Sequence, residues 1–370
     1  MTNDQQTQRP RRVVVALSGG VDSSTAAALL VEQGYQVSGM MMRLWAVRYE
    51  GEFVENRCCS NAAVLDARRT CALLGIPFKL VNLEQEFRAR VVDYFCDGYA
   101  AGRTPNPCLA CNLEIKFKIL LGLALDTGAD YLATGHYARV QQCNGQYQLL
   151  KGIDPSKDQS YVLYMLGQEE LAHVLFPLGD YTKRQVRAMA AGYGLPTAHK
   201  TESQDACFLR DDGYHTFIAQ ERPETVRPGP ILDQQGNVLG QHRGVAFYTI
   251  GQRQGLGLAA RYPLYVLEID CARNALIVGS KSALFRRELL AEQVRFVAGS
   301  PPPSPVPITA KIRYKASEAQ ALLYPLAGGT ARVVFADPQP AITPGQGVVF
   351  YQGDIVLGGG IIASAGPSEV

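Results

Sequence analysis

A short segment rich in glycine and hydroxyl side chains carries the clearest chemistry in the sequence. Residues 18–24 read Ser-Gly-Gly-Val-Asp-Ser-Ser, between an apolar run at 13–17 and a helical pattern at 25–31. Glycine lets a backbone approach a phosphate closely, and the N–H groups and the dipole at the start of a helix favour an anion. The spacing therefore predicts a loop that grips the phosphates of a nucleotide.

The residues after the glycines indicate which class of nucleotide-binding loop this is. The segment has neither the Gly-Lys-Ser/Thr of a Walker loop nor the third glycine of a dinucleotide-binding loop. It resembles instead the pyrophosphate loop of the N-type ATP pyrophosphatases, which release pyrophosphate when ATP adenylates a substrate oxygen. We therefore expect ATP chemistry that activates an oxygen for replacement.

Three cysteines form a second candidate site. Cys108 and Cys111 belong to the run Pro-Asn-Pro-Cys-Leu-Ala-Cys at residues 105–111, and Cys207 follows Glu-Ser-Gln-Asp-Ala at residues 202–206. Because proline disfavours a helix interior, we expect the helix here to begin at about residue 112, with Cys111 at its start. A helix N-terminus can lower the pKa of a cysteine and enlarge its thiolate fraction, so Cys111 is a candidate nucleophile.

Zinc is the alternative use of a Cys-x-x-Cys pair. A structural zinc site takes four ligands, and the sequence has no second Cys-x-x-Cys or Cys-x-x-His, which leaves the three thiols above as the natural set. The total of nine cysteines is odd and argues for reduced thiols rather than a disulfide framework. We expect packing or incidental roles for the remaining six, which are Cys58, Cys59, Cys71, Cys96, Cys143 and Cys271.

The composition is that of a globular protein of two or three domains, with 370 residues of which 47% are hydrophobic and 19% charged. No apolar run approaches the ~20 residues that span a bilayer, and residues 1–12 show no signal-peptide pattern, so we expect a cytoplasmic protein without membrane contact. The net charge of +2 neither requires nor excludes nucleic acid. Basic clusters at residues 116–118, 183–187 and 311–315 are candidate contacts, although such a run is more often a solvated face.

The elements that would position these residues alternate strand and helix from residue 13 to about residue 207. The pattern predicts strands at residues 13–17, 37–42, 78–82 and 131–134, and helices that end at residue 33 or span residues 62–74 and 113–125. Such alternation is typical of an α/β fold with a doubly wound parallel sheet, which binds ligands at the carboxyl ends of its strands. The loops at 18–22 and 134–136 would both lie there and share one ATP.

The chain turns to β structure after about residue 211, where turn signals become dense. We expect hairpins within residues 231–240 and 262–280 and a compact barrel at 308–362, which a strand at 294–297 would join. This gives an α/β pyrophosphatase domain at 1–212, a small central β domain at 213–284 and a C-terminal β-barrel domain at 285–370.

Over nearly its whole length the chain resembles the bacterial tRNA-specific 2-thiouridylases. The resemblance rests on the pyrophosphate loop and on Ala-Gly-Arg-Thr-Pro-Asn-Pro at 101–107, Glu-Ile-Lys-Phe-Lys at 114–118, Ala-Thr-Gly-His-Tyr at 133–137, Lys-Asp-Gln-Ser-Tyr at 157–161, Gly-Gln-Arg at 251–253 and Thr-Pro-Gly-Gln at 343–346. It implies that ATP adenylates the C2 oxygen of the wobble uridine of tRNA, with release of pyrophosphate, and that sulfur then displaces this oxygen. It also implies Mg²⁺, a protein that delivers persulfide sulfur, and a monomer whose barrel contacts tRNA.

The resemblance also implies roles for individual residues. ATP would be held by Ala16, Leu17, Ser18, Gly19, Gly20, Val21, Asp22, Ser23, Met42 and Gly135. The target base would be approached by Asn106, Pro107, Cys108, Lys157, Asp158 and Gln159, while His136, Arg313, Tyr314 and Gln346 would contact tRNA. Cys207 would carry the persulfide sulfur, and Cys111 would be its partner nucleophile. Taken without the resemblance, His136 would be an ordinary loop histidine, and Arg313 and Tyr314 would be exposed strand residues.

One position departs from the family pattern. Better-known members carry an aspartate, proposed as an acid/base, where this chain has Cys108, so that role lacks its usual residue. Cys108, Cys111 and Cys207 together resemble the three-cysteine set of related tRNA thiolation enzymes, which bind a 4Fe-4S cluster with one open iron that could carry sulfide. A persulfide on Cys207 and a cluster on the three thiols are both open mechanisms.

Two functions outside thiolation also fit a pyrophosphate loop. One is an ATP pyrophosphatase that amidates or ligates a small molecule, which would have no evident need for paired thiols or a basic β tail. The other is a non-catalytic RNA-binding protein whose loop only grips phosphate, which the loop aspartate and the second ATP loop disfavour.

Overall fold

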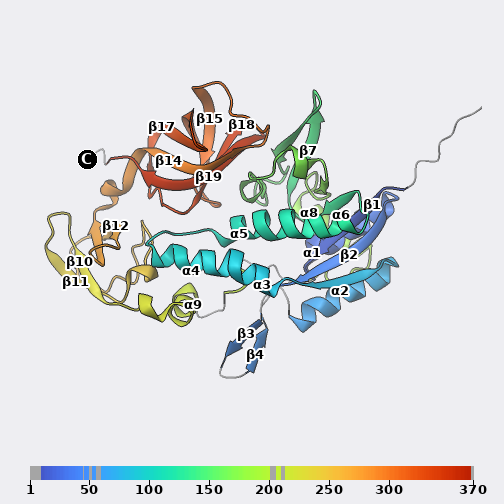
Figure 1. The fold of residues 1–370 in the computed structure, drawn as a ribbon, viewed down its shortest axis with the longest axis horizontal. Coiled ribbons are helices and arrows are strands. Elements are labelled where there is room, and N and C mark those ends of the chain that lie inside the picture. The colour runs from blue at the N-terminus through green and yellow to red at the C-terminus, as the bar shows by residue number, and fades with distance from the viewer. Residues whose placement is uncertain are drawn as a thin grey trace, which may run out of the picture.

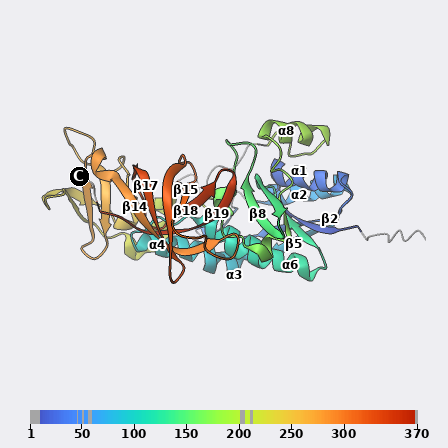
Figure 2. The same cartoon turned by 90° about the horizontal axis from the view of Figure 1, so that it is seen from above.

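The computed structural model describes residues 10–44, 46–49, 52–55, 60–200, 206–209 and 213–367. A parallel sheet with its helices occupies one end of the molecule, and a small β unit and a β barrel occupy the other (Figure 1). Helices α4 (Asp93–Ala100) and α5 (Pro107–Ala110) lie between the two ends, and Figure 2 shows the elongated shape from above.

The sheet at the first end has five parallel strands in the order β5-β2-β1-β6-β9. They are β1 (Arg12–Leu17), β2 (Gln36–Arg43), β5 (Phe78–Asn82), β6 (Tyr131–Ala133) and β9 (Val174–Leu175). Successive side chains of β1 enter different cores, because Val13 and Val15 pack with α1 and α2 while Val14 packs with the helices on the opposite face. Helices therefore cover both faces, which confirms the predicted doubly wound sheet.

The helices around this sheet begin and end at recognisable signals. α1 (Val21–Glu32) starts directly after the glycine loop, and α2 (Asn61–Leu74) has the Ser60 side chain as its N-terminal cap and ends at Gly75, whose φ is +65°. The others are α3 (Glu84–Phe87), η1 (Arg88–Val92), α6 (Leu121–Asp126), α7 (Gln168–Leu171), α8 (Lys183–Gly192) and α9 (Gly213–Glu221), with single turns η3 (Ser160–Val162), η4 (Pro223–Thr225), η5 (Val245–Phe247) and η6 (Lys281–Leu284).

The helix that carries the cysteine pair starts earlier than the sequence analysis predicts. It runs without a break from α5 through the π-helical η2 (Cys111–Leu120) into α6, so the prediction of a start at about residue 112 is wrong. Pro107 occupies the first helical position. The N–H of that position has no partner within the helix, so its absence in proline costs nothing, and the φ of proline suits a helix. Asn106 caps the helix, since its Oδ1 accepts a hydrogen bond of 3.0 Å from the Cys108 N–H. Cys108 rather than Cys111 therefore lies in the first turn.

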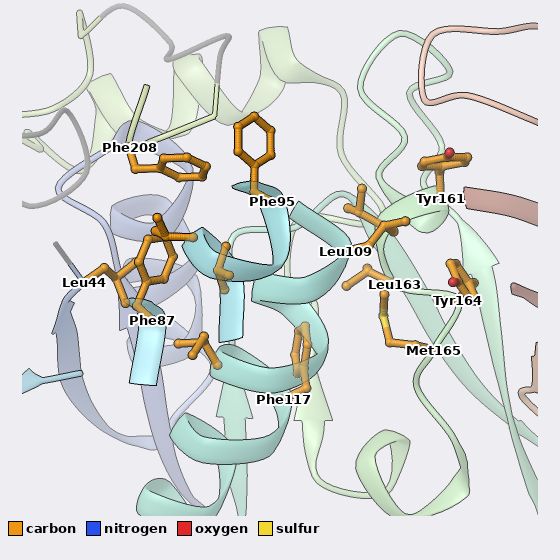
Figure 3. Close-up of a cluster of buried hydrophobic side chains, with 14 of the residues drawn as sticks. Leu44, Phe87, Phe95, Leu109, Phe117, Tyr161, Leu163, Tyr164, Met165 and Phe208 are labelled. Atoms are coloured by element: carbon orange, nitrogen blue, oxygen red, sulfur yellow. The ribbon is translucent and has the colours of Figure 1, made fainter. Parts of the chain in front are cut away.

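One large apolar core joins the helical layer to the rest of the molecule. Figure 3 shows part of it, with Phe87, Phe95 and Phe208 gathered on one side and Leu109 and Tyr161 on the other. The cluster includes residues of the sheet, of the helices, of the small β unit and of the barrel. Within the described residues, no helix combines the length and the apolarity needed to cross a membrane.

The two β units have the predicted character. The small unit is a four-stranded sheet in the order β11-β10-β13-β12, and strands β14 to β19 form the barrel, which the β14–β19 pairing closes. The strands are β10 (Gly229–Leu232), β11 (Val238–His242), β12 (Tyr265–Asp270), β13 (Ala275–Gly279), β14 (Phe285–Phe296), β15 (Val306–Lys311), β16 (Ala319–Leu326), β17 (Thr330–Pro340), β18 (Gly347–Gln352) and β19 (Ile355–Ala365), and a separate hairpin pairs β3 (Ala46–Tyr49) with β4 (Glu52–Glu55). The expected strand at 294–297 is the end of β14.

A hairpin that the sequence analysis did not identify joins the first unit to the barrel. β7 (Ala138–Cys143) pairs with β8 (Gln146–Lys151), and β8 pairs with the barrel strand β19, so the hairpin extends the barrel's sheet. A second junction lies at Thr104, whose N–H donates to the Pro344 carbonyl at 2.9 Å and whose carbonyl accepts from the Gln346 side chain at 2.7 Å. These contacts fix the barrel against the loop that leads to the cysteine helix.

Candidate active site

The carboxyl ends of three neighbouring strands form the centre of the candidate site. β1 ends at Leu17 and continues into the loop, β2 reaches Met42 just before its end, and β6 is followed by Thr134 and Gly135. Since the sheet order is β2-β1-β6, these ends are adjacent. The structure thus brings together the loop and the two other segments for which ATP contacts are predicted.

The loop leaves the start of α1 open. Gly20 is the N-cap residue and supplies no side chain to cover the first N–H groups of the helix. Ser18 is exposed and Gly20 half-buried, and only the Ser18 Oγ lies near the position that a Gly20 side chain would take. Ser23 holds the loop from inside, because its Oγ accepts from the Ser18 N–H at 3.1 Å and donates to the Gly20 carbonyl at 3.3 Å. This geometry suits the phosphate oxygens of ATP.

Two glycines are required by close packing around the loop. A Cβ on Gly135 would lie 2.8 Å from the Ser23 backbone N and 2.9 Å from the Asp22 carbonyl carbon. A Cβ on Gly19, whose φ is +67°, would lie 2.3 Å from the Ala63 carbonyl oxygen. Both neighbours are backbone atoms that cannot swing away, so only glycine lets these segments pack around the loop.

Asp22 is held on two sides. Its Oδ1 accepts a hydrogen bond of 2.8 Å from the Tyr137 hydroxyl, and both of its carboxylate oxygens accept from the Lys183 Nζ, at 2.7 and 2.8 Å. Tyr137 is 2% exposed and the Lys183 side chain 11% exposed, whereas the Asp22 side chain is 31% exposed, so two buried donors hold an acid that stays partly accessible. The loop therefore presents an acid whose position is fixed by groups from later in the chain.

A second lysine reaches the loop from the other side. The Lys200 Nζ donates to the Gly19 carbonyl at 2.9 Å and to the Asp66 carboxylate at 2.8 Å. The sequence analysis missed the roles of both lysines. Lys183 carried only the weak signal of a basic cluster, and Lys200 carried none, because its partners lie 181 and 134 residues away in the sequence.

The cysteine pair lies on one helix with different exposures. Cys108 is exposed in its first turn, and Cys111, one turn later, is half-buried against the large core cluster. Cys207 is half-buried against the same cluster. Among the described residues, no group of three or more His, Cys, Asp or Glu side chains is arranged to hold a metal ion. The cluster on the three thiols and the persulfide on Cys207 both stay predictions.

Phe208 anchors the segment that bears Cys207. Its ring is 2% exposed and makes edge contacts with Phe87 and Phe95, at centroid distances of 5.9 and 5.2 Å, and a contact with Phe217 at 5.2 Å (Figure 3). Residues 202–205 of the predicted Cys207 motif lie outside the described residues. The position of the thiol thus depends on this aromatic anchor.

We expect the substitution Phe208→Ala to lower the free energy of unfolding by about 3–5 kcal/mol, because it removes a buried ring and leaves a cavity. Urea titration followed by circular dichroism measures the change. Tyr262→Ala is the matched control, since Tyr262 is 63% exposed and its loss should cost within about 0.5 kcal/mol. Equal losses for the two variants would contradict the anchoring role.

The remaining cysteines fall into two groups. Burial raises the pKa of Cys71 to about 11 and that of Cys96 to about 12, so both are protonated packing thiols, as predicted. Cys143 and Cys271 are exposed instead. Cys58 and Cys59 lie outside the described residues.

His136 lies below the surface. It is 7% exposed, and its Nδ1 lies 2.7 Å from the Thr134 Oγ1 while its Nε2 lies 3.4 Å from the Lys116 Nζ. Burial, with a further effect of the Lys116 charge, holds the His136 pKa well below its usual value of 6.5. Its contact with tRNA stays a prediction, and in this structure the ring instead supports the loop after β6.

The buried His136 makes stability depend on pH. The folded chain resists protonation of this ring and the unfolded chain does not. The neutral ring therefore contributes to the free energy of unfolding above pH 6.5, and this contribution is lost as the pH falls below that value. In the wild type, the free energy of unfolding should fall as the pH is lowered from 7 to 5. We expect His136→Gln to reduce this slope by up to about 1.4 kcal/mol per pH unit. Urea titrations across this range measure the slope, and His173→Gln, at an exposed position, is the control. A slope that His136→Gln leaves unchanged would contradict the assignment.

The residues predicted to approach the target base lie in two places. Asp158 is tied to its own segment, since it accepts from the Gly152 and Ser160 N–H groups, whereas Gln159 accepts from the N–H of Tyr137, which precedes β7. Asn106, Pro107 and Cys108 form the start of the cysteine helix, as described above. Half-buried Lys157 precedes Asp158.

The predicted tRNA contacts of the barrel do not lie in a strand. Arg313 and Tyr314 follow β15 in a bend and turn, so the alternative of exposed strand residues is wrong. Arg313 donates to the Pro340 carbonyl at 3.2 Å, and the half-exposed Tyr314 ring lies 5.9 Å from that of Tyr161. The Gln346 side chain donates to the Thr104 carbonyl, which gives it a role in docking the barrel.

Models of known families match most of the chain in three consecutive parts. The model described as the tRNA methyl transferase HUP domain matches residues 11–211, the tRNA methyl transferase PRC-barrel domain matches 215–280, and the aminomethyltransferase beta-barrel domain matches 286–362. The curated relatives carry another name. The tRNA-specific 2-thiouridylase MnmA of Moorella thermoacetica is 54% identical over 95% of this chain and 99% of its own length, and that of Roseiflexus castenholzii is 50% identical with the same coverage.

Among solved structures, the chain is similar to an enzyme of RNA thiolation. A 4-thiouridine synthetase in complex with RNA and bound ATP is 18% identical, with a TM-score of 0.35, over 58% of this chain and 51% of that one.

Proposed function

The chain belongs to the tRNA-specific 2-thiouridylase family, and from this membership we propose that it replaces the C2 oxygen of a tRNA uridine by sulfur at the expense of ATP. The membership confirms the resemblance inferred from the sequence. The observation that carries the proposal is the loop of Ser18 and Gly20, which leaves the first N–H groups of α1 uncovered and against which Gly135 packs. Such a loop serves ATP cleavage and has no evident use in transfer of a methyl group, which the names of the family models suggest.

We place the activation step at the pyrophosphate loop. The uracil C2 oxygen attacks the α-phosphorus of ATP, and pyrophosphate leaves into the N–H groups at the start of α1. Mg²⁺ would accompany the ATP phosphates, with the Asp22 carboxylate as its candidate protein ligand, since hard oxygen ligands suit this ion. The product carries AMP on C2, and AMP is a far better leaving group than the original oxygen.

We assign the sulfur step to the two half-buried thiols. The terminal sulfur of a persulfide on Cys207 attacks C2, and AMP leaves with the original oxygen. The Cys111 thiolate then attacks the Cys207 sulfur, which releases 2-thiouridine and leaves a disulfide between the two cysteines. A persulfide-delivering protein would supply the next sulfur after an external thiol reduces this disulfide. No step is routed through an iron-sulfur cluster, because the persulfide route needs only the two thiols and the sulfur donor.

Nucleoside analysis tests the reaction. A tRNA transcript with uridine at the wobble position is incubated with the protein, ATP, Mg²⁺ and a persulfide donor such as glutathione persulfide, and its nucleosides are then analysed by mass spectrometry. We expect a sulfur-for-oxygen mass shift on uridine, together with AMP and pyrophosphate in equal amounts, and no shift in a transcript with cytidine at that position. A methylated uridine, or pyrophosphate release without sulfur incorporation, would contradict the proposal.

A further inference from the structure

One loop of the first unit reaches the pyrophosphate loop by two separate routes. This loop, residues 154–159, lies between β8 and η3 and contains the predicted tRNA contacts Lys157, Asp158 and Gln159. Both routes end on the carboxylate of Asp22. None of the predicted roles of these residues accounts for such a connection.

The first route passes through Tyr137. The Gln159 side chain accepts from the Tyr137 N–H at 3.0 Å, and the Gln159 N–H donates to the Tyr137 carbonyl at 2.9 Å. The Tyr137 hydroxyl donates to Asp22 at 2.8 Å. A displacement of Gln159 thus moves the backbone of the residue whose side chain holds Asp22.

The second route passes through Lys183. The Asp154 Oδ2 accepts from the Lys183 N–H at 2.9 Å, at the first residue of α8. The Lys183 Nζ donates to both carboxylate oxygens of Asp22. The backbone of Lys183 is thus fixed by the 154–159 loop while its side chain fixes the pyrophosphate loop.

Both routes run through tightly packed residues, so a displacement of the 154–159 loop is transmitted to Asp22. Tyr137 is 2% exposed, and a Cβ on Gly152 would lie 2.9 Å from the Tyr137 carbonyl oxygen. The 154–159 loop is also tied to the barrel, because the Ser160 Oγ donates to Asp158 at 2.9 Å and lies 3.3 Å from the hydroxyl of the barrel residue Tyr351. The loop therefore sits between the barrel and the acid of the ATP site.

We propose that Tyr137 and Lys183 are positioning residues that make ATP cleavage depend on bound tRNA. Binding of tRNA to the 154–159 loop fixes its position, and the two routes then fix Asp22 at the pyrophosphate loop. This inference rests on the proposed function, since it takes tRNA as the ligand of that loop. Its consequence is that water does not cleave ATP before the uridine is in place, and pyrophosphate release without tRNA measures this hydrolysis.

Substitution of Tyr137 tests the first route. Tyr137→Phe keeps the buried ring and removes only the hydroxyl that holds Asp22. Pyrophosphate release is measured with and without tRNA, and the ratio of the two rates is the readout. We expect the ratio to fall at least about tenfold, the effect of one hydrogen bond to a charged group. Tyr164→Phe, at a tyrosine 4% exposed in the same core, should keep the wild-type ratio.

Substitution of Asp154 tests the second route independently. Asp154→Ala leaves Lys183 and Asp22 in place but frees the backbone of Lys183 from the 154–159 loop, and it should lower the same ratio. An unchanged ratio in both Tyr137→Phe and Asp154→Ala, or an equal fall of both rates in each, would overturn the inference, because a merely structural role leaves the ratio unchanged.

Tests of the two proposals can be told apart. Nucleoside analysis of the wild-type reaction is run in parallel. Absence of 2-thiouridine there would overturn the proposed function and this inference with it. Normal thiolation by the wild type, with a wild-type ratio in both variants, would overturn this inference alone.

Discussion

Replacement of Cys111 or Cys207 by serine will abolish tRNA thiolation while ATP is still cleaved. The hydroxyl of serine neither carries a persulfide nor attacks one, whereas the pyrophosphate loop is untouched by either change. We expect the rate of 2-thiouridine formation to fall by at least about 10³-fold, as for the loss of a nucleophile in other enzymes. Mass spectrometry of the tRNA nucleosides gives this rate, and pyrophosphate release in the presence of tRNA gives the rate of the first step.

Variants of two other cysteines test whether the effect is specific to Cys111 and Cys207. Cys143→Ser changes an exposed cysteine on β7 and should leave both rates unchanged. Cys108→Ala separates the two sulfur mechanisms, because a cluster on three thiols would lose its iron and its colour after anaerobic reconstitution, whereas the persulfide route needs no iron. A wild type that thiolates only when it holds iron would contradict the persulfide assignment, as would a Cys207→Ser variant that retains activity.

The features that sequence alone predicted are those whose determinants are local. The apolar strand, the two glycines and the helix start of the pyrophosphate loop lie within 20 consecutive residues, and their geometry follows from that order. The doubly wound sheet followed because strands buried on both faces read as continuous apolar runs. The hairpin of β7 and β8 also had a local signal, Asn144-Gly145 with positive φ at both residues, which the sequence analysis overlooked.

The contacts that fix the site were beyond the sequence because their partners are remote. Tyr137 and Lys183 reach Asp22 across 115 and 161 residues, and no local pattern indicates such pairs. The start of the cysteine helix was mispredicted for another reason. Proline breaks the interior of a helix, but at the first helical position, where Pro107 lies, it favours one. The helix therefore starts at Pro107 rather than at about residue 112, and Cys108 rather than Cys111 lies in its first turn.

Gly135→Ala should raise the KM for ATP by roughly 10²-fold, the cost of misplacing a binding group by about 1 Å. The added methyl would lie 2.8 Å from the Ser23 backbone N, so the loop after β6 or the pyrophosphate loop must move. Rates of tRNA-dependent pyrophosphate release over a range of ATP concentrations give the KM. Because the clash is with backbone, we expect no rotamer change to relieve it.

Gly122→Ala is the matched control for this effect, since it adds the same methyl to another glycine of the same unit. Gly122 lies in α6, where an added Cβ would meet nothing within 4 Å. Alanine is favoured over glycine in a helix by about 1 kcal/mol, so this variant should be more stable to urea and keep the wild-type KM. If Gly135→Ala bound ATP as the wild type does, the two loops would not share one nucleotide, and the contact between Gly135 and Asp22 would serve the fold alone. A raised KM in Gly135→Ala with unchanged stability would instead place the nucleotide between the ends of β1 and β6, where the acid held by Tyr137 and Lys183 also lies.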